Sequence, residues 1–231
     1  MSGELIDTTE MYLRTVFELE EEGVVPMRAR IAERLGHSGP TVSQTIARME
    51  RDGLIVVTRD RHLEMTDTGR ELATRVMRKH RLAERLLSDV IGLDWELVHD
   101  EACRWEHVMS DEVERRIVTL LEGQRESPYG NPIPGLGALG LDESGSEDFR
   151  SGLLVITDLA EPADVVVRRL SEPVQVDPTS LAMLRELGVQ PGRRLRVDPT
   201  GGGWAVRPLE SDGASRDLPE ELAEHVFVGR L

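Results

Sequence analysis

The chain has a single cysteine and no long apolar run. Cys103 cannot form an intrachain disulfide, and a free thiol is typical of a protein kept in a reducing compartment. No apolar stretch approaches the roughly 20 residues of a membrane-spanning helix. The segment from Met1 to Asp7 has neither the basic region nor the apolar region of a secretion signal. These absences predict a cytoplasmic protein without membrane contacts.

The charge of the chain is negative overall but positive in one segment. The net charge of -15 at pH 7 argues against a wholly basic nucleic-acid-binding protein. Between residues 23 and 62, however, seven arginines accompany only four acidic residues. A local basic patch is sufficient for DNA contact, so the acidic total does not exclude it. The length of 231 residues predicts two or more domains.

The first 65 residues have the pattern of a winged helix. Asp7 is a suitable N-cap for an apolar-periodic helix that ends before Gly23. Two short helices, 28–35 and 40–51, flank a glycine-containing turn, which predicts a helix-turn-helix. A hairpin of strands 54–57 and 63–65, with arginines at its tip, would form the wing.

The second helix of this motif is expected to read DNA with its exposed face. Val42, Ile46 and Met49 repeat at helical spacing and should be buried, which leaves Gln44 on the opposite side. Gln44 can pair with adenine through two hydrogen bonds, and Pro40 can contact a thymine methyl group. The residues expected to position the helix are Arg28, Arg30, Ser38, Thr41, Ser43, Arg48, Arg51 and Arg61. Any one of these arginines could instead be a solvated surface charge.

Helices alternate with breaks in the middle of the chain, and strands dominate its last third. Helices are predicted for residues 67–87 and 95–123. The segment 127–135 contains three prolines, so it cannot be a helix or a central strand. Together with the acidic stretch 142–148, it is expected to form a linker. Beyond residue 151 the pattern predicts a small β-barrel with strands at 153–156, 164–168, 194–197 and 204–206 and one helix at 179–187.

Potential metal ligands are concentrated between residues 80 and 107. Three of the six histidines and the only cysteine fall there. If 95–123 is one helix, His99, Cys103, Glu106 and His107 share a stripe on its surface. Nitrogen, sulfur and oxygen donors together suit iron, cobalt, nickel or zinc better than calcium or magnesium. A buried His or Cys can also be an ordinary core residue, but the clustering of such scarce residue types favours a metal site.

Several segments resemble the diphtheria toxin repressor family, in particular its iron-dependent regulators. The resemblance is carried by residues 7–14, 28–35, 38–44, 99–107 and 127–135; it is nearly continuous through residue 140 and looser beyond. It implies a multi-domain α+β protein that consists of a winged helix-turn-helix DNA-binding domain (1–73), a helical dimerisation and metal-binding domain (74–140), a linker (141–150) and an SH3-like small β-barrel (151–231). The implied function is an iron(II)-activated repressor of iron-uptake and iron-homeostasis genes, which binds a palindromic double-stranded operator as a homodimer.

The same resemblance implies two metal sites. The activating site would consist of Met11, Cys103, Glu106 and His107. The ancillary site would consist of His80, Glu84, His99, Glu172 and Gln175. The thioether of Met11 and the thiolate of Cys103 favour Fe(II), whereas a manganese sensor is expected to have carboxylates at these positions. Co(II), Ni(II), Zn(II) and Mn(II) are expected to substitute in vitro, and a regulator that responds to manganese or another divalent metal is the alternative.

Other classes of function fit the sequence less well. A metallohydrolase would need an open metal position beside a general base, and the chain has neither a His-Glu-x-x-His motif nor a nucleophile elbow. We therefore do not expect an enzyme. A regulator that senses an organic ligand would leave the cluster of His, Cys and Glu without a role.

Overall fold

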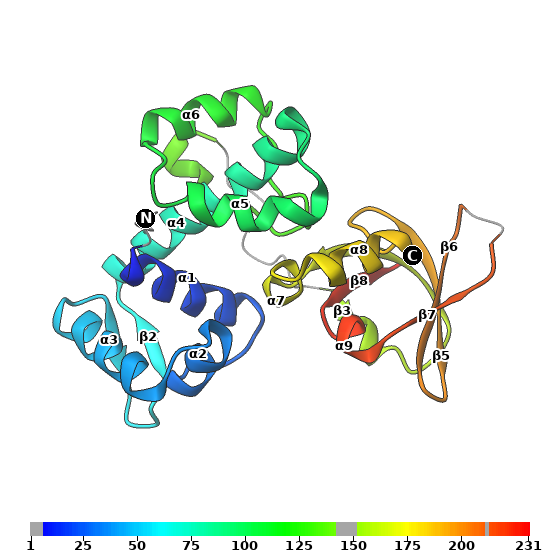
Figure 1. Ribbon diagram of the computed structural model, residues 1–231, viewed down its shortest axis with the longest axis horizontal. Helices are drawn as coiled ribbons and strands as arrows, with labels where there is room; N and C mark the ends of the chain where they lie inside the picture. The colour runs from blue at the N-terminus through cyan, green and yellow to red at the C-terminus, as the bar shows by residue number, and fades with distance from the viewer. Residues whose placement is uncertain (1–6, 142–151, 211–212) are drawn as a thin grey trace.

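The computed structural model describes residues 7–141, 152–210 and 213–231. Its N-terminal part is the predicted winged helix, at the lower left of Figure 1. Ser38 caps the second helix of the motif by accepting a hydrogen bond from the Thr41 amide, so this helix begins at Gly39, one residue before the predicted start. The predicted buried face of Val42, Ile46 and Met49 is confirmed. The elements are α1 (Thr8–Glu21), α2 (Arg28–Leu35), α3 (Gly39–Arg51), β1 (Ile55–Val57) and β2 (Leu63–Met65).

The middle of the chain is helical, but the predicted single helix over 95–123 is wrong. Residues 106–110 form a turn, and Ser110 then caps a new helix by accepting a hydrogen bond from the Val113 amide. Acidic residues at 111 and 112 favour a helix N-terminus at this point, which is a signal already present in the sequence. The elements are α4 (Asp67–Arg85), a π-helical turn (Leu86–Ile91), a 3-10 turn (Trp95–Leu97), α5 (Val98–Trp105) and α6 (Asp111–Leu120). The domain boundary expected after residue 73 falls inside α4.

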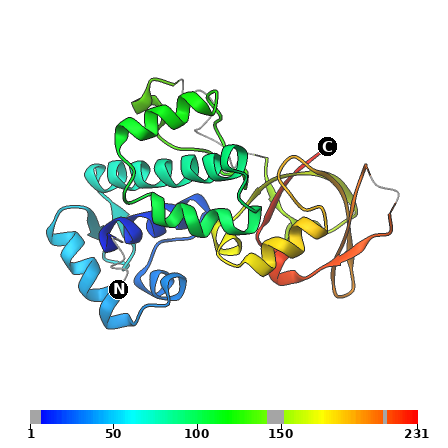
Figure 2. The same ribbon diagram turned by 45° about the horizontal axis from the view of Figure 1, so that its top comes forward.

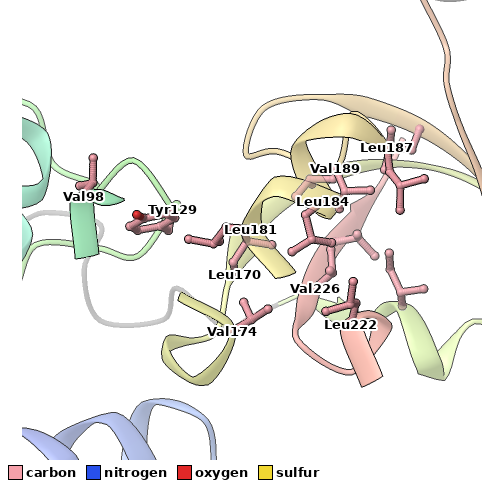
Figure 3. Packing of buried hydrophobic residues seen from close by; sticks show 14 of the residues in the cluster. Val98, Tyr129, Leu170, Val174, Leu181, Leu184, Leu187, Val189, Leu222 and Val226 are labelled. Carbon is pink, nitrogen blue, oxygen red and sulfur yellow. The ribbon is translucent and has the colours of Figure 1, made fainter. Parts of the chain in front are cut away.

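The proline-rich segment is packed against both neighbouring domains and is not a free linker. The Tyr129 side chain is fully buried, and its hydroxyl donates to the Trp95 carbonyl (2.8 Å). Asn131 donates to the Leu170 carbonyl in the C-terminal domain (3.0 Å). Figure 3 shows Tyr129 between Val98 and the Leu170 side of the C-terminal core. The expected linker at 142–148 lies outside the described residues.

The C-terminal domain is built on a six-stranded antiparallel sheet, as expected for an SH3-like barrel. The strand order is β3-β8-β4-β5-β6-β7. All four predicted strands are present, but β7 and β8, which lies between β3 and β4, were not predicted. Val226 and Val228 of β8 are buried, and their alternation was the available signal. The strands are β3 (Leu154–Val155), β4 (Ala163–Leu170), β5 (Arg194–Thr200), β6 (Gly203–Pro208), β7 (Arg216–Leu218) and β8 (Val226–Arg230), and the helices are α7 (Glu172–Gln175), α8 (Pro178–Glu186) and α9 (Glu220–Ala223).

Helices from all three parts of the chain meet near the centre of the molecule. Helix α4 packs against both α1 and α5, and Figure 2 shows these three helices together. Helix α7 extends from the C-terminal domain toward the space between α1 and α5 (Figure 1). Among the described residues, no helix is both long and apolar enough to span a bilayer.

Candidate metal centre

Four side chains form a compact, buried cluster at the junction of α4, α5 and α7. Nε2 of His80 lies 2.8 Å from Oε1 of Glu84, which is 3.1 Å from Nδ1 of His99. Oε2 of Glu172, on α7, lies 3.7 Å from the same His99 nitrogen. One ligand atom from each of these four residues lies within 4.8 Å of those of the other three. The structure therefore brings together four of the five predicted ancillary residues at a separation suited to a shared cation.

Unpaired oxygens make this cluster chemically suited to a cation. Oε2 of Glu84, Oε2 of Glu172 and Oε1 of Gln175 are buried and have no hydrogen-bond partner. Gln175 donates through Nε2 to the Leu170 carbonyl (3.0 Å), so its oxygen is the unsatisfied atom. Buried oxygens without a donor are costly, and a bound cation would satisfy them. Pro173, which falls in the first turn of α7, does not disturb the helix that carries Glu172 and Gln175.

The four predicted activating residues line one cavity of about 210 Å³ beside this cluster. Cys103 is on α5, Glu106 is the C-cap of that helix in helical conformation, and His107 follows in a turn. These three residues still line the same cavity as His99, as the predicted stripe requires. Oε1 of Glu106 lies 3.2 Å from Nε2 of His107. Met11 reaches the same cavity from the first turn of α1.

Charged neighbours favour the anionic forms of two donors. Burial alone raises the pKa of the Cys103 thiol, but Arg14 and His99 together hold it well below its usual value. Burial also raises the pKa of Glu106, and Arg14 and His80 again outweigh it, so this pKa is lowered. A thiolate and a carboxylate are thus available as metal donors at neutral pH.

The two histidines of the ancillary cluster are shifted in the opposite direction. Burial lowers the pKa of His99, but the Cys103 thiolate and Glu84 raise it to about 10. Burial and Arg14 lower the pKa of His80, whereas Glu84 and Glu106 raise it well above its usual value. The raised pKa values favour the protonated rings in the metal-free protein, and any such proton has to leave the nitrogen that binds a metal.

Three charged residues around the donors were not predicted from the sequence. Arg14 and Glu10 are on α1: Arg14 contacts Cys103 and Glu106, and Glu10 accepts from Nδ1 of His107 (2.7 Å). This contact leaves Nε2 of His107, which faces Oε1 of Glu106, as the ring nitrogen available to a metal. Arg81 is fully buried and donates to Oε1 of Glu172 (3.0 Å). Met11 and Arg14 share one face of α1 at a spacing of three residues, which is the signal that could have revealed Arg14.

Comparisons with known proteins identify the family of this chain. Residues 4–63 match the family model "Iron dependent repressor, N-terminal DNA binding domain", and residues 66–135 match "Iron dependent repressor, metal binding and dimerisation domain". The chain belongs to the iron-dependent repressor family. It is 57% identical to the iron-dependent repressor IdeR of Mycobacterium tuberculosis, over 99% of this chain and 100% of that protein. It is 56% identical to the diphtheria toxin repressor of Corynebacterium glutamicum, over 99% of this chain and 98% of that protein.

Solved structures extend the similarity to the whole fold. A manganese-dependent transcriptional repressor in complex with manganese matches with a TM-score of 0.83 at 29% identity, covering 97% of this chain and 100% of that one. IdeR of T. acidophilum matches with a TM-score of 0.74 at 27% identity, covering 97% of this chain and 98% of that one. The family thus includes relatives named for iron and structural neighbours named for manganese.

The iron-dependent repressor family binds DNA, and the winged helix of this chain exposes the predicted contact residues. Gln44, Pro40 and the positioning residues Arg30, Ser38, Thr41, Ser43, Arg48, Arg51 and Arg61 are exposed, whereas Arg28 is only partly so. The Ser38 hydroxyl also lies 2.8 Å from that of Thr41, so both help to begin α3. Arg30 pairs with Glu33 (3.1 Å) and Arg51 with Asp52 (3.0 Å) at the surface. Such exposed pairs are weak and can exchange for phosphates.

Proposed function

We propose that this chain is an Fe(II)-activated repressor that binds a palindromic operator as a homodimer. The observation that carries the proposal is the single cavity that unites the thioether of Met11, on α1, with Cys103, Glu106 and His107. These donors come from different parts of the chain, and α1 belongs to the DNA-binding winged helix. A divalent cation bound by all four donors would connect the winged helix to the helical domain. We further propose His80, Glu84, His99, Glu172 and Gln175 as the ligands of an ancillary site.

A hydrogen bond links α1 to the start of the recognition helix. The Tyr12 hydroxyl, one residue beyond Met11, lies 2.9 Å from Nδ1 of His37. His37 precedes Ser38, which caps α3. Restraint of Met11 therefore acts on a helix that is bonded to the turn in front of the DNA-reading residues. In this mechanism, metal binding restricts the positions that α1 can adopt. A larger fraction of the protein is then in the conformation that binds DNA.

Softness of the donors favours iron over manganese. Met11 and Cys103 offer sulfur, which Fe(II), Co(II), Ni(II) and Zn(II) accept more readily than Mn(II). The manganese-dependent neighbour shares the fold at 29% identity, and we propose that the donor types, rather than the fold, decide the metal. We expect Mn(II) to be the weakest of these activators.

Exposed apolar residues on the helical domain support the homodimer. Val90, Ile91, Val108 and Leu120 lie around the π-helical turn, the end of α5 and α6, and each is at least half exposed. Such residues are unfavourable in water and typical of a surface that a second copy covers. Each subunit of the dimer would then place Gln44 and the positioning arginines on one half of the operator, as a palindromic sequence requires. We place this regulator in the cytoplasm with its DNA, and we infer no enzymatic activity.

The direct test is anaerobic binding of the purified protein to a palindromic operator duplex. We expect tight binding with Fe(II) or Co(II) and weak binding in excess chelator. A duplex of the same length without the palindrome is the control for non-specific contacts, which depend on salt rather than sequence. Equal operator affinity in metal and in chelator would refute the proposal.

A further inference from the structure

The guanidinium of Arg14 lies among the donors of both proposed metal sites. Its Nη1 is 2.8 Å from Oε2 of Glu106, 3.2 Å from Sγ of Cys103 and 3.4 Å from Nδ1 of His80. Its Nη2 is 3.4 Å from Nε2 of His99. The side chain is only 13% exposed. One cationic group therefore contacts the two anionic donors of the activating set and two histidines of the ancillary set.

Charge explains why a cation is needed there in the metal-free chain. A buried thiolate and carboxylate are strongly unfavourable without positive charge beside them, and Arg14 supplies this charge together with His80 and His99. A guanidinium stays charged at any pH at which the protein is folded, and it has no lone pair to offer a metal. It can neutralise Cys103 and Glu106, but it cannot share them with a divalent cation at bonding distance, because the two positive charges repel each other.

We propose that Arg14 is a built-in counter-ion that competes with the metal, so that its guanidinium holds Cys103 and Glu106 in the metal-free protein and has to leave them when a metal binds. The inference rests on the proposed activating site. It assigns Arg14 a role in setting the metal concentration at which the repressor responds. Because the contacts of Arg14 stabilise the metal-free chain, they weaken metal binding by the same free energy.

The structure also provides a position for the displaced side chain. Nε of Arg14 is held 2.6 Å from Oε1 of Glu18, one turn further along α1. Glu18 lines the same cavity as Cys103, and Arg34 pairs with Glu18 there (3.7 Å). Arg14 can therefore keep its contact with Glu18 while the end of the guanidinium turns away from Cys103 and Glu106 into the cavity.

Co(II) titration of an Arg14→Leu variant tests this inference, because leucine removes the charge without adding a metal donor. Thiolate-to-cobalt absorption reports occupancy of Cys103, and a competing chelator gives the affinity. We expect Arg14→Leu to bind Co(II) about tenfold more tightly than wild type or better and to unfold at a lower temperature in chelator. Arg14→Lys keeps the charge and should lie between the two. The matched control is Arg75→Leu, which removes an exposed arginine of α4 that pairs with Asp111 (2.7 Å) and should leave the Co(II) affinity unchanged.

The outcomes separate this inference from the proposed function. If wild type binds Co(II) with a thiolate band, and Arg14→Leu binds it equally or more weakly, the competition by Arg14 is refuted while the metal site stands. If wild type shows no thiolate band, the proposed site itself fails, and the inference fails with it. Should Arg14→Leu not fold in chelator, Arg14→Ala, which also offers no metal donor, is titrated instead with the same expectation and the same contradicting result.

Discussion

The two proposed metal sites are neighbours, but they are organised differently. Four of the five ancillary residues converge to within 4.8 Å in a buried cluster that already has unpaired oxygens. The activating residues line a cavity, and Arg14 contacts two of them, Glu106 at 2.8 Å and Cys103 at 3.2 Å. Arg14 is farther from His80 and His99, at 3.4 Å. The activating set therefore has the closer contacts to break, and it includes a residue of the DNA-binding domain. The difference suggests that the ancillary site supports the structure and that the activating site transmits the signal.

Removal of the thiolate should have the largest effect. In Cys103→Ala, the activating set loses a donor that is both soft and negatively charged. Loss of a residue that only supports a metal ligand typically costs roughly 10- to 100-fold in affinity, so we expect metal-dependent operator affinity to fall by about 100-fold or more. The measurement is an anaerobic operator titration in Fe(II). Cys103→Asp is the control, because it retains an anionic donor but changes softness; it should respond better to Mn(II) and less well to Fe(II). An unchanged order of metals in Cys103→Asp would contradict the assignment.

The two sites should also differ in their dependence on pH. His80 and His99 each lose a proton when the ancillary site binds a metal, and the pKa of His99 is about 10, so affinity there should rise with pH through the neutral range toward that value. In the activating set, the lowered pKa values of Cys103 and Glu106 favour their deprotonated forms, so these donors release no proton on metal binding. Only His107 has a raised pKa in this set, because its hydrogen bond to Glu10 and the charge of Glu106 outweigh burial.

Variants that each weaken one site allow this difference to be measured. Met11→Leu reports the ancillary site and Glu84→Ala the activating site. Between pH 6.5 and 8, Co(II) affinity should rise more steeply in Met11→Leu, by up to about tenfold more per pH unit for one additional proton released. If Co(II) affinity rises equally with pH in the two variants, the proposed difference in proton release between the two sites is wrong.

Loss of an ancillary ligand should reduce, but not abolish, activation. Glu172→Ala is a cleaner test than His80→Ala, because Nδ1 of His80 also lies 2.6 Å from Oε2 of Glu106 and so touches both sites. We expect Glu172→Ala to lower operator affinity at limiting Fe(II) by roughly 5- to 10-fold, on the scale of a supporting ligand. Glu224→Ala, an exposed change in the same domain, should have no effect. Complete loss of activation in Glu172→Ala would mean that both sites are equally necessary for activation.

The smallest effect is expected from Tyr12→Phe. This change removes the hydrogen bond to His37 but keeps the buried ring, so operator affinity should fall by about 1 kcal/mol. Co(II) affinity should remain that of wild type, because Tyr12 is not a metal donor. Measuring both affinities on the same preparation separates transmission of the signal from binding of the metal. A parallel loss of Co(II) affinity would show that Tyr12 acts on the metal site instead.

Sequence patterns predicted what depends on local rules and missed what depends on tertiary contacts. The cap at Asp7, the helix start at Pro40 and the spacing of Val42 and Ile46 predicted the winged helix. Scarce His and Cys residues pointed to the candidate metal centre, although the turn after α5 was missed. The position of Arg14 against α5 could not be predicted, since periodicity places a residue on a face of its own helix but does not say what lies opposite.

The central claim is that metal at the activating site restrains α1 through Met11. Hydrogen exchange of the α1 amides, Thr8–Glu21, tests it most directly, with Met11→Leu as the matched variant that keeps the apolar shape without the thioether. Our account predicts that Fe(II) slows exchange in the first turns of α1 in wild type, and that it does so far less in Met11→Leu. Exchange that is the same with and without Fe(II) in wild type, or protection by Fe(II) that persists undiminished in Met11→Leu, would contradict it.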